Sequence, residues 1–177
     1  MTTVETERLV GEPITAAHHD ELCALLGDPR VGATLGGALT PARVAASIER
    51  QQAHWEQHGF GFRLWRERAT GAAVARGGLF HTHVGERDEV EVGWAVVSAR
   101  WGEGFATELG AASVRTGFED LALRDVVAFT LPHNRASLRV MDKLGFEFER
   151  NVVHAELPHV LYRLAAPGPA RAGAGAD

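Results

Sequence analysis

Two glycines stand in a short turn between an apolar stretch and a helix-forming segment. Gly102 and Gly104 follow the run that ends at Val97, and a helix is predicted to begin near Ala106. A strand that passes through a glycine turn into a helix points several backbone N–H groups at one spot, with the positive end of the helix behind them. Such a turn binds an anion, most often phosphate. The same glycines also suit a plain strand-to-helix turn that needs positive φ angles.

Two carboxylates and two histidines are spaced for chemistry on neighbouring predicted strands. Glu89 and Glu91 fall on one face of an alternating stretch, and paired carboxylates raise one another's pKa, which suits a general base. The structural alternative is that one or both are solvated or form a salt bridge, for example with Arg76. His81 and His83 have a spacing that could hold a metal, but no third ligand is evident. Surface or acceptor-site histidines are therefore favoured, and no metal is predicted.

The composition is that of one soluble globular domain. The chain has 177 residues, 45% of them apolar and 23% charged, which is enough to bury a sizeable core. A net charge of −5 argues against nucleic acid or an anionic membrane as a partner. Cys23 is the single cysteine, which excludes a disulfide framework, and the N-terminus shows no apolar leader. We therefore expect a cytoplasmic location.

Capping signals predict the helices that must position these groups. Thr40 followed by Pro41 predicts a helix over residues 41–58, and Thr15 predicts one over 17–26. The glycine- and proline-rich residues 27–37 between them indicate a loop. Further along, Asn134 is a good N-cap for a short helix that ends at Leu144 before Gly145, and the spacing of four apolar residues predicts the buried face of the helix after the glycine turn: Ala111, Val114, Phe118 and Leu121.

Strands are predicted from alternation, apolar runs and turn residues at 5–14, 61–67, 73–80, 89–97, 125–131, 146–154 and 157–164. The resulting order, β-α-α-β-β-β-α-β-α-β-β, predicts an α/β sandwich around a mixed sheet of about six to seven strands with about four helices. The strand–helix–strand unit around the glycine turn should cross over right-handed, which makes its two strands parallel. One domain is expected over residues 1–165, followed by a disordered low-complexity tail over 166–177.

Two motifs together resemble the GNAT superfamily of acyl-CoA N-acyltransferases. They are W-G-E-G-F-A-T-E and, one helix and one strand later, N-R-A-S-L-R-V-M-D-K-L-G-F. Within that superfamily the chain resembles the RimJ/RimL-like branch, which acetylates the N-terminal amines of ribosomal proteins. Supporting matches are T-E-R-L near the start, H-G-F-G before the hairpin, G-G-L at 77–79 and E-V-G-W in the central strand. The resemblance covers about residues 5–164 and implies a sheet that splays at its centre.

The resemblance implies acetyl-CoA as cosubstrate and assigns the glycine turn to its pyrophosphate. The family pattern Arg/Gln-x-x-Gly-x-Gly/Ala falls on residues 101–106, with Trp101 where the family usually has Arg or Gln. Backbone N–H groups hold the phosphates, so Gly102, Gly104 and Ala106 are expected to stay small. The implied cofactor contacts are Val96, Val97, Trp101, Gly102, Glu103, Gly104, Phe105, Ala106, Thr107 and Asn134.

The catalytic assignments also follow from the resemblance. The acceptor amine must be neutral to attack, and Glu91 is the first candidate for the base that takes its proton. Many members have a tyrosine seven residues after the asparagine, which protonates the leaving thiolate. Met141 stands at that position here and cannot donate a proton. Ser137 matches the serine proposed for this role in the ribosomal branch, although it is also simply the third residue of the helix that Asn134 caps.

The sequence thus predicts an enzyme that transfers an acetyl group from acetyl-CoA to a primary amine by direct attack. A non-catalytic acyl-CoA-binding module is the alternative, and Met141 favours it. The acceptor stays open between a protein N-terminus and a small-molecule amine, because acceptor pockets on one fold vary with its loops. No nucleic acid or membrane partner is expected, whereas a homodimer is common in the family that the chain resembles.

Overall fold

A computed structural model describes residues 3–168 of the chain. Its strands are β1 (Val4–Glu5), β2 (Leu9–Pro13), β3 (Phe62–Glu67), β4 (Ala73–Val84), β5 (Arg87–Val96), β6 (Asp125–Thr130), β7 (Glu147–His154) and β8 (Leu157–Ala165). Its α-helices are α1 (His19–Leu26), α2 (Pro29–Gly32), α3 (Pro41–His58), α4 (Phe105–Arg115) and α5 (Arg135–Lys143). The predicted α/β sandwich is confirmed, and these residues form more strands and helices than the six to seven and four that we expected.

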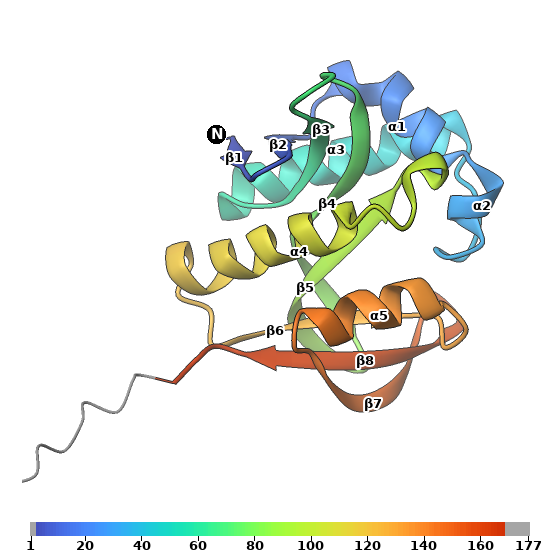
Figure 1. The fold of residues 1–177 in the computed structure, drawn as a ribbon. Coiled ribbons are helices and arrows are strands. Elements are labelled where there is room, and N and C mark those ends of the chain that lie inside the picture. The colour runs from blue at the N-terminus through green and yellow to red at the C-terminus, as the bar shows by residue number, and fades with distance from the viewer. Residues whose placement is uncertain (1–2, 169–177) are drawn as a thin grey trace, which may run out of the picture.

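The strands form one mixed sheet in the order β1-β2-β3-β4-β5-β6-β8-β7. As predicted, β5 and β6 are parallel, and every other neighbouring pair is antiparallel. All of β5, from Arg87 to Val96, pairs with β4, but β5 meets β6 only where Glu91 lies beside Val127. β5 and β6 therefore separate beyond Glu91, and the sheet splays there (Figure 1).

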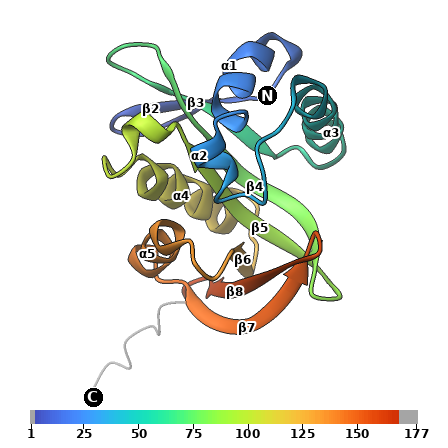
Figure 2. The ribbon, with the colours of Figure 1, turned by 90° about the vertical axis from the view of Figure 1, so that its right-hand side faces the viewer.

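Helices cover both faces of this sheet. α4 and α5 lie on one face, and α3 lies on the other (Figure 2). Val44 and Ile48 of α3 pack with Phe62 of β3 in one buried cluster. Phe105 and Leu109 of α4 pack in a second cluster against the opposite face. A ligand that enters at the splay can consequently reach from the α4/α5 face toward the α3 face.

Local helix signals were read correctly at both ends of α3 and α5. The Thr40 hydroxyl accepts a hydrogen bond from the Arg43 N–H, and Gly59 ends α3 with a φ of 75°. Asn134 caps α5 as predicted, and Gly145 follows it with a φ of 83°. Capping and positive-φ glycine depend on residues close in sequence, which explains why these boundaries were predictable.

Three expectations about local structure were wrong. The predicted loop over 27–37 contains α2, because the Asp28 carboxylate caps it by accepting from the Arg30 N–H at 2.8 Å. The single strand predicted over 5–14 is split into β1 and β2, which pair antiparallel with each other. The second strand of the hairpin does not end at Phe80 but continues to Val84.

The buried face predicted for the helix after the glycine turn was correct at three of its four residues: Val114, Phe118 and Leu121 pack against a buried cluster. Ala111 is exposed, and the fully buried apolar residues of α4 are Phe105, Leu109 and Ala112. The helix changes after Arg115 into a turn of π-helix over Thr116–Asp120. Val114 of α4 and Phe118 of that turn nevertheless pack against the same cluster, so the apolar face continues across the change.

Within residues 3–168, no helix is both long and apolar enough to cross a lipid bilayer. Residues 166–168 follow β8 without forming a helix or strand. The rest of the predicted disordered tail, residues 169–177, lies outside the described part of the chain. That residues 1–165 form a single domain remains our proposal.

Candidate functional site

The glycine turn has the backbone geometry that its sequence predicts. Gly102 and Gly104 have φ angles of 85° and 88°, and Gly104 is the N-cap of α4. A Cβ atom on Gly102 would meet no protein atom within 4 Å, and one on Gly104 would meet only Arg8, at 3.4 Å. Positive φ, rather than crowding by the protein, therefore requires glycine at both positions. The first N–H groups of α4 are left to face the space in front of the turn.

Side chains outside the turn hold it in place. Arg8 donates from Nη1 to the Glu103 carbonyl at 2.9 Å and from Nε to Glu108 at 2.7 Å. The Arg100 guanidinium pairs with the carboxylates of Glu67 and Glu103. Arg8 and Arg100 also lie over the Phe105 ring, with Cζ 4.6 and 4.8 Å from its centre. Glu103 thus braces the turn from outside and does not line the cleft.

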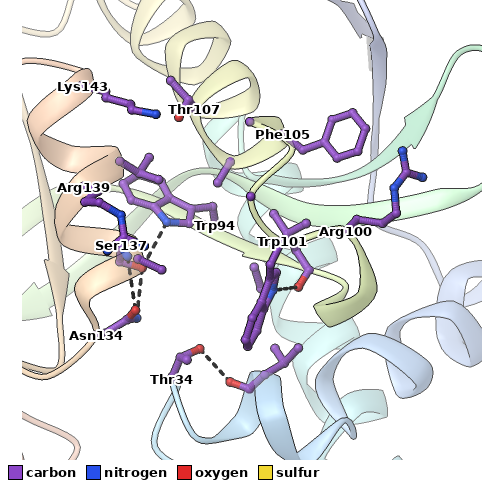
Figure 3. Close-up of a pocket in the computed structure, with 18 residues that line it drawn as sticks. Thr34, Trp94, Arg100, Trp101, Phe105, Thr107, Asn134, Ser137, Arg139 and Lys143 are labelled. Carbon is purple, nitrogen blue, oxygen red and sulfur yellow. Dashed lines mark hydrogen bonds between the residues drawn. The ribbon is translucent and has the colours of Figure 1, made fainter.

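An open cleft lies in front of the turn, between β5, α4 and α5, and encloses about 180 Å3 (Figure 3). It is lined by Val31, Thr34, Trp94, Ala95, Val96, Arg100, Trp101, Gly102, Gly104, Phe105, Ala106, Thr107, Asn134, Ala136, Ser137, Arg139, Val140 and Lys143. These residues include three cations and no carboxylate. The combination of free helix N–H groups, basic side chains and an apolar wall fits a ligand with phosphates on a slender arm.

Arg139 and Lys143 are the cleft residues that sequence reasoning missed. They belong to α5, on the side opposite the glycine turn (Figure 3). A signal for them existed, because 136, 139, 140 and 143 follow the three- and four-residue spacing of one helix face. Counting from Ala136 along the helix in these steps would have found both cations.

Trp101 donates a hydrogen bond to a backbone carbonyl at the splay. Its indole Nε1 donates to the Val96 carbonyl at 2.8 Å, although the side chain is 48% exposed. Val96 lines the cleft, whereas Val97 turns away, donates its N–H to the Val74 carbonyl and packs in the core. Of the two valines predicted to meet the cofactor arm, the structure places only Val96 on the cleft.

The N-cap of α5 organises a small hydrogen-bond network at the edge of the cleft (Figure 3). Asn134 accepts from the Ser137 N–H at 3.2 Å and donates from Nδ2 to the hydroxyls of Thr130, at 2.9 Å, and Ser137, at 3.0 Å. Trp94 Nε1 donates to the same Ser137 oxygen at 3.3 Å. Since Ser137 Oγ accepts two hydrogen bonds, its own proton is left to point elsewhere, and the cleft is on that side.

Met141 is buried beneath this network. Only 1% of its surface is exposed, and it packs in the core between α5 and the sheet. A side chain at this position does not reach the cleft, and the thioether carries no proton. Ser137 is therefore the cleft residue of α5 whose hydroxyl can donate a proton to a leaving group.

Glu91 does not line the cleft but lies at the point where β5 and β6 part. Burial raises its pKa to about 7, and the neighbouring Arg76 guanidinium opposes that rise. Its carboxylate accepts no hydrogen bond from residues 3–168. A partly buried carboxyl with a pKa near neutrality suits a general base that works at physiological pH.

We expected Glu89 and Glu91 to raise one another's pKa, and that cause was wrong. Glu89 forms an ion pair with Arg163 at 2.7 Å and lies near Arg150. Burial, and not a second carboxylate, raises the pKa of Glu91. Of the alternatives that the sequence left open, the salt bridge therefore applies to Glu89, although its partners are Arg163 and Arg150 and not Arg76.

The histidines of β4 form no metal site. Among residues 3–168, no group of three or more His, Cys, Asp or Glu side chains could hold a metal ion. His81 packs beside His58 with ring centres 4.3 Å apart, while His83 pairs with Asp88. His54 is locked neutral, because its Nδ1 lies 2.8 Å from the Phe60 carbonyl and its Nε2 accepts from the His81 N–H. Burial lowers the pKa of His54 to about 4, in agreement with that arrangement.

Comparison with known proteins identifies the family. A sequence model described as an acetyltransferase (GNAT) domain matches residues 8–147. YoaA of Bacillus subtilis, a yet uncharacterised N-acetyltransferase, is 27% identical over 147 residues, which cover 82% of this chain and 83% of YoaA. The solved structure of a Bordetella pertussis protein assigned to the GnaT acetyltransferase family superposes with a TM-score of 0.81 at 26% identity, covering 93% of this chain and all of that one.

A more distant structural neighbour is RimL, a ribosomal L7/L12 acetyltransferase that was solved in complex with coenzyme A. It superposes with a TM-score of 0.72 at 13% identity, covering 93% of this chain and 98% of RimL. At that identity the likeness shows the fold alone.

Proposed function

The chain belongs to the GNAT acetyltransferase family and is an acyltransferase that uses acetyl-CoA, and from that premise we propose that it acetylates a primary amine by direct attack. The proposal rests on three features around the splay: the positive-φ glycine turn and the Ser137 hydroxyl both line the cleft, and Glu91 lies where β5 and β6 part. They can supply, respectively, a phosphate cradle, a proton donor and a proton acceptor. Holding both substrates there supplies much of the rate by proximity.

In this proposal the residues divide the work along the cleft. The N–H groups at the start of α4 hold the pyrophosphate, and Arg139 and Lys143 face it from α5. Backbone groups of β5 near Val96, freed where β6 diverges, hold the pantetheine arm and polarise the thioester carbonyl. The carbonyl of Val96 becomes available only when Trp101 releases it. Asn134 keeps one lone pair of Oδ1 for a contact with the arm.

Proton transfer is assigned to two groups on different elements. Glu91 removes the proton from the attacking amine, directly or through a water molecule, and Ser137 returns one to the departing thiolate. Asn134 and Trp94 both donate to the Ser137 oxygen and so fix the direction of its proton. They act as positioning residues for Ser137.

A non-catalytic acyl-CoA-binding module is the second candidate, because Met141 leaves the cleft without a tyrosine hydroxyl. Release of free thiol from acetyl-CoA in the presence of a panel of amines separates the two. We expect amine-dependent thiol release. Tight binding of acetyl-CoA by calorimetry, with no thiol released by any amine, would refute the enzyme and leave the binding module.

The motifs that resemble the ribosomal-protein branch lie around the proposed cofactor site, and they do not identify the acceptor. Arg8 of the T-E-R-L match braces the glycine turn. Gly77 and Gly93, from the G-G-L and E-V-G-W matches, permit close packing, since a Cβ on Gly77 would lie 2.4 Å from the Gly93 carbonyl. A protein N-terminus and a small-molecule amine are both acceptors that this proposal allows. It retains the cytoplasmic location and the homodimer expected from the sequence, and light scattering tests the dimer.

A further inference from the structure

An arginine and a glutamate face each other across the α3 side of the splay without forming an ion pair. Arg76 lies beside Ala95 in the sheet, next to the cleft, and Glu91 lies four residues earlier on β5. No salt bridge joins these two side chains, and within residues 3–168 neither makes a hydrogen bond. The Arg76 Nε atom is buried and has no partner. Partly buried charges that lack hydrogen-bond partners are costly unless something else binds them.

Packing explains why the two do not close on each other. The Arg76 guanidinium stacks on the Phe62 ring, with Cζ 4.6 Å from the ring centre. Phe62 is itself fixed, because its ring fills the space above Gly93, where a Cβ atom would lie 2.7 Å away, and because it packs against Phe80. Arg76 is thus held against an aromatic face instead of closing on Glu91.

The helix that covers this face of the sheet also carries a buried polar atom without a hydrogen-bond partner. α3 covers this face of the sheet through Val44 and Ile48. One turn further along, Gln51 is 4% exposed, and its Oε1 is buried without a hydrogen-bond partner. The α3 layer therefore contributes an unused buried acceptor close in sequence to its contacts with the sheet, while the sheet contributes an unused donor and an unused carboxylate.

On the basis of this arrangement we propose that the acceptor is an α-amino acid, or a small molecule with the same pairing of amine and carboxylate, and that Arg76 determines this specificity by binding the carboxylate. The inference rests on the proposed function, because the amine must present itself to Glu91 next to the thioester. A zwitterion complements both unpaired groups: its carboxylate would meet the guanidinium and its amine would meet Glu91. An amine without a nearby carboxylate would leave Arg76 unpaired and buried.

The charges that act on Arg76 agree with that assignment. The groups that influence Arg76 are Glu91 and Arg50, which lies on α3, and burial lowers the Arg76 pKa to about 10. The guanidinium therefore remains charged at neutral pH. A carboxylate bound to it would be held by a charge-assisted pair, the kind that discriminates most strongly against an analogue lacking the group.

The test compares each acid with its own amide. Thiol release is measured for the twenty L-amino acids, their α-carboxamides, putrescine and the peptide Ala-Ala-amide. For the preferred side chain we expect the acid to exceed its carboxamide in kcat/KM by about ten- to a hundredfold, the factor that a charged hydrogen bond carries. Arg76→Gln should bring this ratio close to one, mainly through KM of the acid. The ratio within one variant cancels any effect of Arg76 on the base.

Arg43→Gln is the matched control, because it removes the same charge from an exposed position on α3 and should leave the ratio within twofold of wild type. If Arg76→Gln does not fold, Arg76→Lys and the wild-type comparison still decide the matter. Equal use of acids and carboxamides, or a preference for putrescine or the peptide, would overturn this inference while leaving the acetyltransferase proposal standing. Acetyl-CoA binding without thiol release from any amine would instead overturn both.

Discussion

Replacing Glu91 by glutamine separates its proposed role as a base from its effect on stability. The folded-state pKa of Glu91 is about 7, above its ordinary value of 4.5. A group whose pKa is raised by folding contributes full stability below its unfolded pKa and loses it as the pH rises through the folded pKa. Glutamine mimics the protonated form at every pH. Wild type and variant should therefore be equally stable at about pH 3.5, below the unfolded pKa, and differ at pH 9.

The size of the difference follows from the same shift. A rise from 4.5 to about 7 corresponds to about 3 kcal/mol if it is fully expressed. Glu91 is partly exposed, so solvent screening reduces the effect. We expect Glu91→Gln to be more stable than wild type at pH 9 by about 1–2 kcal/mol, measured by urea unfolding with unchanged slope. A variant no more stable than wild type at pH 9 would show that the pKa is not raised.

Activity should change in the opposite direction. With a carboxylate as base, the wild-type rate of thiol release rises with pH to a plateau, with its midpoint near 7. Glu91→Gln should lose about a hundred- to ten-thousandfold of kcat above pH 8, and the midpoint should disappear. Glu89→Gln is the matched control, since it breaks the pair with Arg163; it should lower stability and leave the midpoint in place. If Glu91→Gln keeps both rate and midpoint, Glu91 is not the base.

Three further predictions concern the cleft. Gly104→Val forces a branched side chain to a φ of 88° and should abolish acetyl-CoA binding in calorimetry while the circular dichroism spectrum is retained; unchanged affinity would remove the turn from the site. Ser137→Ala should lower kcat at least tenfold with the KM for acetyl-CoA within twofold, and equal kcat values would assign the donor to water. Replacing Arg139 and Lys143 together by alanine should weaken acetyl-CoA binding and flatten its dependence on salt. Unchanged salt dependence would show that neither residue contacts phosphate.

The accuracy of the sequence-based predictions depended on how far each signal reaches. Thr40 and Asn134 as caps, like the positive-φ glycines 102 and 104, are fixed by neighbours a few residues away, and all were found where predicted. α2 was missed although its signal is also local: Asp28 followed by Pro29 repeats the N-cap and proline of Thr40 and Pro41, but the glycines around it favoured a loop. Asp28 also accepts a hydrogen bond from Ser98, seventy residues along the chain, and no local pattern could indicate that partner.

Side-chain environment was the part of the site that sequence could not supply. Glu89 and Glu91 are two residues apart on one face of β5, and alternation correctly placed them together. Their surroundings nevertheless differ, because β8 places Arg163 next to Glu89, whereas Phe62 holds Arg76 away from Glu91. One carboxylate is consequently neutralised by an ion pair, and the other is left with a pKa near 7 at the splay. The strand pattern identifies two candidate bases, and only the packing across the sheet leaves one of them free to accept a proton.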